Sequence, residues 1–337
     1  MDLTTVWFVL IAVLWTGYFV LEGFDFGVGM LLPVLGRGET RRRMMLGAIG
    51  PVWDGNEVWL ITAAGATFAA FPHWYATLFS GFYLPMLVIL VALIVRALGF
   101  EYRGKRDEEH WRRRWDVAIV LGSVVPAFSW GAVLATMVHG VALDGSGELT
   151  GSPLLVLADP VALLGGLTAV ALFLTHGALF VALKTDGEVR HDARELAVRT
   201  GAVAVPLAVA AVLALGVSRG SAAAWLAGAI ALAALGAGLL AALRRREGRA
   251  FSGTFVAIGA LVAGAFLALW PDVMPSTLDP AWSLTAAEAS STAYTLRIMT
   301  WVAAIFTPVV LLYQGYTYWV FRKRLRPQHV SPANPVR

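Results

Sequence analysis

Long runs of apolar residues, separated by short polar segments, make up most of this chain. A helix needs roughly 20 apolar residues to cross about 30 Å of hydrocarbon, and nine runs are long enough to do so. The expected spans are 5–35, 44–71, 75–98, 116–139, 160–183, 198–217, 222–243, 251–271 and 293–321. The pattern therefore predicts an all-α integral membrane protein with nine transmembrane helices, whose ends are defined to within several residues.

The basic residues gather at one end of these predicted helices. With the N-terminus outside, all but three of the 26 Lys and Arg residues fall in cytoplasmic connections or in the C-terminal tail, the exceptions being Arg96, Arg219 and Arg297. Basic connections remain on the cytoplasmic side of a membrane. The charges thus predict an odd number of spans, an external N-terminus and a cytoplasmic C-terminus.

Composition agrees with a membrane location. Hydrophobic residues make up 58% of the chain and charged residues 14%, against about 25% charged in soluble domains. The first apolar run has no basic leader or cleavage site, so we expect it to be a retained span of a multi-pass protein in the bacterial plasma membrane. Cysteine is absent, which excludes disulfides and thiolate ligands. No nucleic-acid partner is expected.

The outer connections at 140–158 and 272–292 are too short to form separate domains. Asp159 followed by Pro160 predicts a helix N-cap with proline at the first helical position. We expect a single membrane domain, 1–337, that comprises a first four-helix bundle with the polar residues at 1–140, a second bundle at 159–271 and a last peripheral helix at 293–321.

Acidic residues lie within the predicted spans, where an unpaired charge costs several kcal/mol. Glu22 and Asp25 are three residues apart and share one face of the first helix. Asp54 and Glu57 follow a stretch rich in Gly and Pro around Pro51, where we expect the second helix to be interrupted. These four acids are candidates for proton exchange on a route open to the cytoplasm, and a purely structural role remains the alternative.

A second polar group is expected at the cytoplasmic ends of the third and fourth spans. Arg96 lies near the end of the third span, Glu101 follows it, and Asp116 begins the fourth. A cation and two carboxylates at this depth favour an ion-pair clamp that holds the helix ends together.

The histidines do not predict a haem site. His139 and His176 are the two nearest the hydrocarbon, but they lie at different depths and are too far apart to share one iron. We expect no metal site, no catalytic residue and no bound cofactor in this chain.

Several segments resemble the signature segments of cytochrome bd quinol oxidase subunit II. They occur in the order expected for that family and cover about residues 1–130, with hydropathy and length similar thereafter. The segments are Glu22-Gly-Phe-Asp-Phe-Gly-Val-Gly-Met30, Trp53-Asp-Gly-Asn-Glu-Val-Trp-Leu-Ile-Thr62, Phe79-Ser-Gly-Phe-Tyr83, Arg96-Ala-Leu-Gly-Phe-Glu-Tyr-Arg103 and Trp115-Asp116. Glu22 and Glu57 stand at positions where family members differ in the acid or amide that they carry.

The resemblance implies a heterodimer with a homologous subunit I, which holds two b-type haems and one d-type haem, oxidises quinol and reduces oxygen to water. Subunit II would bind none of these haems and would supply a proton path that includes Asp54. Asp25, Arg96 and Asp116 resemble that family's polar cluster. The resemblance leaves open whether a structural quinone binds in this subunit and whether small single-helix accessory subunits join.

Buried carboxylates and interrupted helices also occur in secondary transporters that couple their substrate to protons or cations. This alternative, and that of a membrane subunit whose acids only hold helices together, both remain open from the residues alone.

Overall fold

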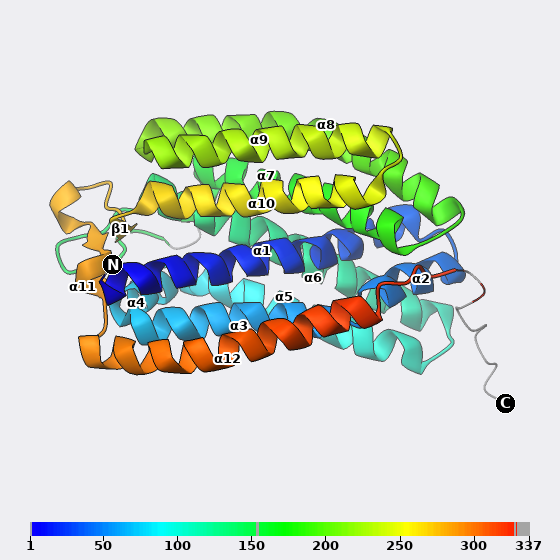
Figure 1. Cartoon of the computed structure of the whole chain (residues 1–337), viewed down its shortest axis with the longest axis horizontal. Coiled ribbons are helices and arrows are strands. Elements are labelled where there is room, and N and C mark those ends of the chain that lie inside the picture. Colours follow the sequence, from blue (N-terminus) through cyan, green and yellow to red (C-terminus); the bar gives the residue numbers. More distant parts are fainter. Residues whose placement is uncertain (1, 153–154, 327, 329–337) are drawn as a thin grey trace.

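The computed structural model describes residues 2–152, 155–326 and 328, and these are almost entirely helical (Figure 1). Eight helices are long and apolar enough to cross a membrane. They are α1 (Leu3–Leu35), α5 (Tyr83–Tyr102), which the short helix η1 (Arg103–Lys105) extends, α6 (Glu109–His139), α7 (Pro160–Lys184), α8 (Glu188–Arg219), α9 (Ala222–Leu243), α10 (Glu247–Leu269) and α12 (Ala293–Val320). The predicted all-α membrane fold is thereby confirmed.

The second predicted span is divided in the structure. It forms α2 (Glu39–Ile49) and α3 (Trp53–Ala70), with the break centred on Pro51. Proline has no backbone N–H to donate and its ring clashes with the preceding turn, so the helix ends before it. α3 carries Asp54 and Glu57 in its first turns and has 18 residues. It is not among the eight helices that length and composition mark as spans.

The third predicted span also begins differently. A short helix, α4 (Pro72–Gly81), comes directly after α3, and α5 starts only at Tyr83. The predicted start at residue 75 therefore falls within α4. By contrast, the predicted N-cap of α7 is confirmed, because the Asp159 side chain accepts a hydrogen bond from Val161 N and Pro160 is the first helical residue.

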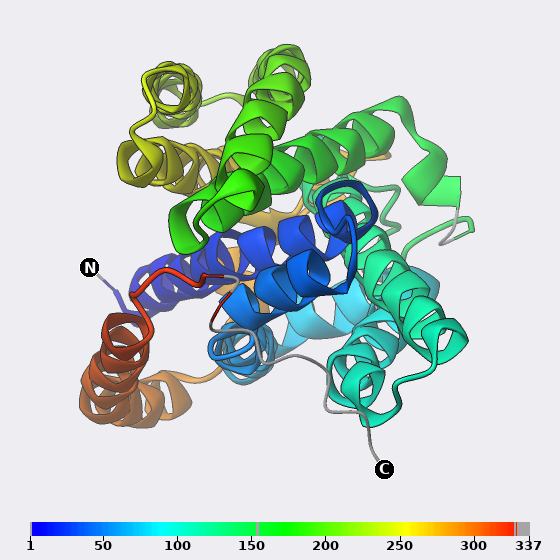
Figure 2. The same cartoon turned by 90° about the vertical axis from the view of Figure 1, so that its right-hand side faces the viewer.

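α1 lies in the middle of the bundle, between α7 and α10 on one side and α3 and α12 on the other (Figures 1 and 2). It crosses α7 at backbone contact. A Cβ atom added to Gly177 would lie 2.6 Å from Gly27 Cα, and one added to Gly27 would lie 2.8 Å from Gly177 Cα. Only glycine permits this approach, which brings the acidic stretch of α1 into the core.

Short elements from the connections that follow α6 and α10 close the end of the molecule at which α1 begins. They are η2 (Leu155–Ala158), the antiparallel pair β1 (Asp272–Met274) and β2 (Leu284–Thr285), η3 (Pro280–Trp282) and α11 (Ala286–Ala289). Backbone hydrogen bonds from Val141 N to Pro275 O and from Thr277 N to Val141 O join the two connections.

α12 lies at the periphery, along α3 (Figure 1), and Leu296 is its only buried residue. It is attached to α1 near its start, where Trp7 Nε1 donates to Leu296 O at 3.2 Å and to Thr300 Oγ1 at 3.1 Å. The rest of its apolar surface is exposed along most of its length.

Candidate polar site in the membrane bundle

Glu22 of α1 and Arg96 of α5 form an ion pair in the protein core. Both side chains are almost completely inaccessible to solvent, with relative exposures of 0% and 1%. The Arg96 guanidinium also lies over two aromatic rings, 4.7 Å from the centroid of Phe26 and 5.1 Å from that of Phe100. A planar, weakly hydrated guanidinium suits such stacking better than an ammonium group does.

Asp25, also fully buried, is bound to α3 rather than to an arginine. Asn56 Nδ2 donates to Asp25 Oδ2 at 2.7 Å. The amide oxygen of Asn56 accepts hydrogen bonds from Tyr318 OH at 2.7 Å and from Gln314 Nε2 at 3.3 Å, both on α12. The network thus connects three helices, and its α12 end is only partly buried.

The two acids of α3 lie between the surface and this core. Asp54 is exposed in the first turn of α3, where its Oδ1 accepts a hydrogen bond from Gly55 N at 2.7 Å. Glu57, one turn further, is partly buried and interacts electrostatically with Asp54, Glu22 and Arg96. A series of acidic groups therefore extends from the protein surface to the buried ion pair.

The core leaves several polar atoms without partners. Among the described residues, no hydrogen bond reaches Glu22 Oε2, Asp25 Oδ1, Arg96 Nε or Arg96 Nη2. An unsatisfied buried polar group costs about 1–3 kcal/mol, and more when it is charged. Groups of this kind are where water molecules or exchangeable protons are expected.

Arg96, Glu101 and Asp116, which we expected to form one clamp, are not brought together. Arg96 pairs with Glu22, whereas Asp116 pairs with Arg103 at 2.5 Å and with Arg42 at 3.2 Å. Glu101 is exposed and has no ion-pair or hydrogen-bond partner among the described residues. The difference arises because Arg96 lies one to two turns before the helix end and points into the core.

An arginine-rich cluster at the helix ends occupies the position expected for that clamp. Arg103 donates to both carboxyl oxygens of Glu39 on α2, at 2.8 and 3.0 Å, and Arg43 donates to Glu39 at 2.8 Å. Partial burial alone would raise the pKa of Glu39, but the hydrogen bonds from the two arginines outweigh it and lower the pKa to about 2.

Sequence reasoning did not identify the roles of Glu39, Asn56, Gln314 and Tyr318. Asn56 stood in the interrupted segment beside the predicted acids, and that position was a usable signal. Gln314 and Tyr318 lie far along the chain in a helix that the pattern marks only as apolar, so no local signal placed them beside Asp25.

His176 of α7 is buried and lies against two residues of α10. The His176 ring is stacked on Phe251, with the ring centroids 4.4 Å apart, and its Nδ1 is hydrogen-bonded to Thr254 Oγ1 at 2.6 Å. Its Nε2 is buried and has no hydrogen-bond partner in the described chain. No group of three or more His, Cys, Asp or Glu side chains in the described chain is arranged to hold a metal ion.

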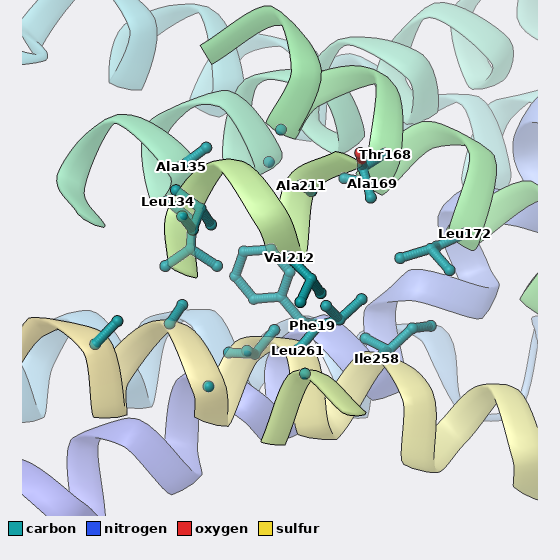
Figure 3. A pocket seen from close by; sticks show the side chains of 18 of the residues that line it. Phe19, Leu134, Ala135, Thr168, Ala169, Leu172, Ala211, Val212, Ile258 and Leu261 are labelled. Atoms are coloured by element: carbon teal, nitrogen blue, oxygen red, sulfur yellow. The ribbon is translucent and has the colours of Figure 1, made fainter. Parts of the chain in front are cut away.

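A largely apolar pocket lies between α6, α7, α8, α9 and α10, and Phe19 of α1 also lines it (Figure 3). Its empty volume is about 840 Å³, and its lining includes Phe19, Thr168, Leu172, Ile258 and Leu261. None of the acids described above lines it.

Comparisons with known proteins show which family this chain resembles in sequence and in fold. Residues 3–321 match the family described as cytochrome bd terminal oxidase subunit II. The cytochrome bd ubiquinol oxidase subunit 2 of Bacillus subtilis is 39% identical, with 98% of each chain covered, and the cytochrome bd-I ubiquinol oxidase subunit 2 of Escherichia coli K12 is 36% identical, with 97% of this chain and 96% of the relative covered. The bd oxidase structure from Geobacillus thermodenitrificans has a similar fold, with a TM-score of 0.75 at 19% identity over 96% of this chain and all of that chain.

Proposed function

We propose that this chain, which belongs to the cytochrome bd terminal oxidase subunit II family, supports a haem-bearing subunit I and supplies that partner with protons from the cytoplasm. The family and the eight apolar helices make it a multi-pass protein of the bacterial plasma membrane and a subunit of a quinol oxidase complex. In such a complex, haems in subunit I carry electrons from quinol to oxygen. The named relatives are oxidase subunits, so nothing supports the alternative of a transporter.

The observation that carries the proposal is the series of acids from Asp54 through Glu57 to Glu22. Asp54 is exposed, Glu57 is partly buried, and Glu22 is fully buried against Arg96. A path for protons needs some surroundings that favour the charged form of a carboxyl group and others that favour its neutral form. The increase in burial along this series provides both. Asp25, which is hydrogen-bonded to Asn56, would lie beside this proton path and adjust the charge of the core.

We propose nine spans, with α3 as the ninth. Its 18 residues extend about 27 Å at 1.5 Å per residue, close to the thickness of the hydrocarbon layer. α3 also runs alongside α1 and α12 (Figure 1). Nine crossings put the start of α1 outside and the basic end, which holds α2, the α9–α10 turn and the end of α12, in the cytoplasm.

In this arrangement 1–140 forms a first four-helix bundle with the polar residues, 159–271 forms a second, and 293–321 is a peripheral helix within a single domain. The apolar pocket of Figure 3 has a lining that suits the prenyl tail of a structural quinone, and we assign that role to it.

The test replaces Asp54 in the assembled oxidase. Asp54→Asn keeps the size of the side chain and its hydrogen bonding but cannot carry a proton. We expect quinol-driven oxygen consumption per haem to fall by roughly 10²–10⁴-fold, the range for losing a proton-transfer group. Because Asp54 is exposed and forms no ion pair in the described chain, haem content should be unchanged.

Asp54→Glu is the matched control, since it restores a carboxyl with a longer reach, and it should retain more activity than Asp54→Asn. Equal and near-normal rates in both variants would show that protons enter by another route.

A further inference from the structure

An open groove lies between the first turns of α8 and the end of α9, away from the acids of α1 and α3. It is at the basic end of the molecule, which faces the viewer in Figure 2, and α8 and α9 lie at the rim of the bundle there. Its lining residues are His191, Arg194, Glu195, Val198, Arg199, Ala242, Leu243 and Arg245. No role described above uses this groove.

Hydrogen bonds hold two side chains of the groove, Arg194 and His191, in place. Glu247, only 5% exposed, accepts a hydrogen bond from Arg194 Nη1 at 3.1 Å. Arg194 Nη2 lies 3.2 Å from His191 Nδ1. When Arg194 donates to that nitrogen, the remaining hydrogen of a neutral His191 ring is on Nε2, so the ring is a further donor. Arg199, on the next turn, is 72% exposed, and Glu195 is its one ion-pair partner in the part of the chain that the structure describes.

Arg245 occupies a position that usually belongs to glycine. It ends α9 with a positive φ of 59°, and the flanking hydrogen bonds from Arg245 N to Ala242 O and from Arg246 N to Ala241 O form a Schellman-type cap. A long side chain in this left-handed conformation is disfavoured. Within the described chain the Arg245 side chain has no ion-pair or hydrogen-bond partner, so its guanidinium is free to bind an anion at the groove.

The other side of the groove is hydrocarbon. Val198, Ala242 and Leu243 line it, and the apolar surface continues along the exposed side chains of Leu240 on α9 and Val203 on α8. The layout is therefore amphipathic, with cations at the end of the helices and apolar side chains toward the bilayer. A free phosphate would use only the cations, whereas a phospholipid uses both parts.

We propose that this groove binds the phosphodiester headgroup of an anionic phospholipid, with Arg199, Arg245 and His191 around the phosphate and an acyl chain along Leu243 and Leu240. The lipid belongs to the cytoplasmic leaflet, an assignment that rests on the proposed orientation. The binding itself does not depend on that orientation or on the proton path.

The experiment uses the intact oxidase complex in phosphatidylcholine nanodiscs that contain a small fraction of phosphatidylglycerol. Native mass spectrometry counts retained phosphatidylglycerol, and a titration gives its apparent affinity. Each basic group near the membrane surface strengthens binding of an anionic lipid roughly fivefold, so Arg199→Gln and Arg245→Gly should each weaken it by about that factor and the double variant by about 30-fold. Arg245→Gly suits the left-handed backbone, and Arg245→Lys should retain most of the affinity.

The matched control is Arg113→Gln, an exposed arginine on α6 at the same end of the molecule. It should bind phosphatidylglycerol as the unchanged protein does. An equal loss in this control would reduce the effect to general surface charge and overturn the proposal, as would unchanged affinity in the double variant. Inorganic phosphate, at an ionic strength matched with chloride, should not displace the lipid, and displacement would identify a site for free phosphate instead. The haem content per complex checks assembly, and the single variants carry the test if the double variant does not assemble.

Discussion

Arg96 is the one cation that faces the buried acids of α1 among the described residues. Replacing it with Met would leave Glu22 in the core without its partner, and breaking a buried pair from one side costs roughly 3–5 kcal/mol. We expect the Arg96→Met complex to show a lower yield and a lower melting temperature, measured in detergent by differential scanning fluorimetry.

The double variant Glu22→Gln/Arg96→Met separates the pair from the packing. It removes both charges, so it should recover much of the lost stability. If the double variant is no more stable than Arg96→Met alone, the stacking of Arg96 on Phe26 and Phe100, rather than its charge, holds these helices.

Glu39 makes the helix-end cluster sensitive to acid. Its pKa of about 2 in the folded protein is below the ordinary value of 4.5. The ionised carboxylate therefore stabilises the folded state fully above pH 4.5, and this contribution is lost as the pH falls toward 2. Glu39→Gln should lower the melting temperature at pH 7, and the difference from the unchanged protein should shrink as the pH falls below 4.5. A difference that stays constant across this range would rule out the linkage.

At the scale of helices, the crossing of α1 and α7 depends on two glycines in contact. Gly27→Ala would force a methyl group against the backbone of α7, and overpacking of this kind costs about 1–3 kcal/mol. We expect a lower yield and melting temperature. Gly65→Ala is the control, because a Cβ atom there meets nothing within 4 Å inside α3, and alanine favours a helix over glycine by up to about 1 kcal/mol. Equal stability of the two variants would contradict the role given to the crossing.

The helices that the sequence predicted well are those whose ends carry local signals. Asp159 and Pro160 start α7, and Pro51 interrupts the second span, because these residues act on their own backbone. The start of α5 was misplaced, since the aromatic residues around Tyr75 continue the apolar pattern through α4 and hide the separate helix. Hydropathy records a run of apolar residues and not where that run bends.

The ion-pair partners of the site residues were harder to predict, because the packing of the helices determines which side chains meet. Glu22 and Arg96 are 74 residues apart, and nothing near either residue favours this pair over Arg96 with Asp116. Asp116 instead pairs with Arg103. From the sequence, Arg103 was only one of the basic residues in a connection between two helices. Depth along a helix is predictable from the sequence, whereas rotation about its axis is set by the neighbouring helices.

At the scale of the whole molecule, the different depths predicted for His139 and His176 lead us to expect that this chain alone holds no stoichiometric haem. Expressing it with and without the haem-bearing subunit, followed by purification and visible spectroscopy, tests this expectation. Haem bands and quinol-dependent oxygen consumption should appear only with the partner present. One tightly bound haem per isolated chain would contradict both this expectation and the role proposed for the chain.

The ion pair between Glu22 and Arg96 cannot form until both residues have been synthesised. A ribosome adds about 5–20 residues per second, so the 74 residues that separate the two side chains take roughly 4–15 s to follow. α1 is therefore complete, with both of its acids, before α5 has been made. The insertion machinery must therefore keep α1, the first helix to be made, out of contact with lipid until Arg96 has been synthesised. A delay in translation between α1 and α5 would expose the nascent chain to degradation.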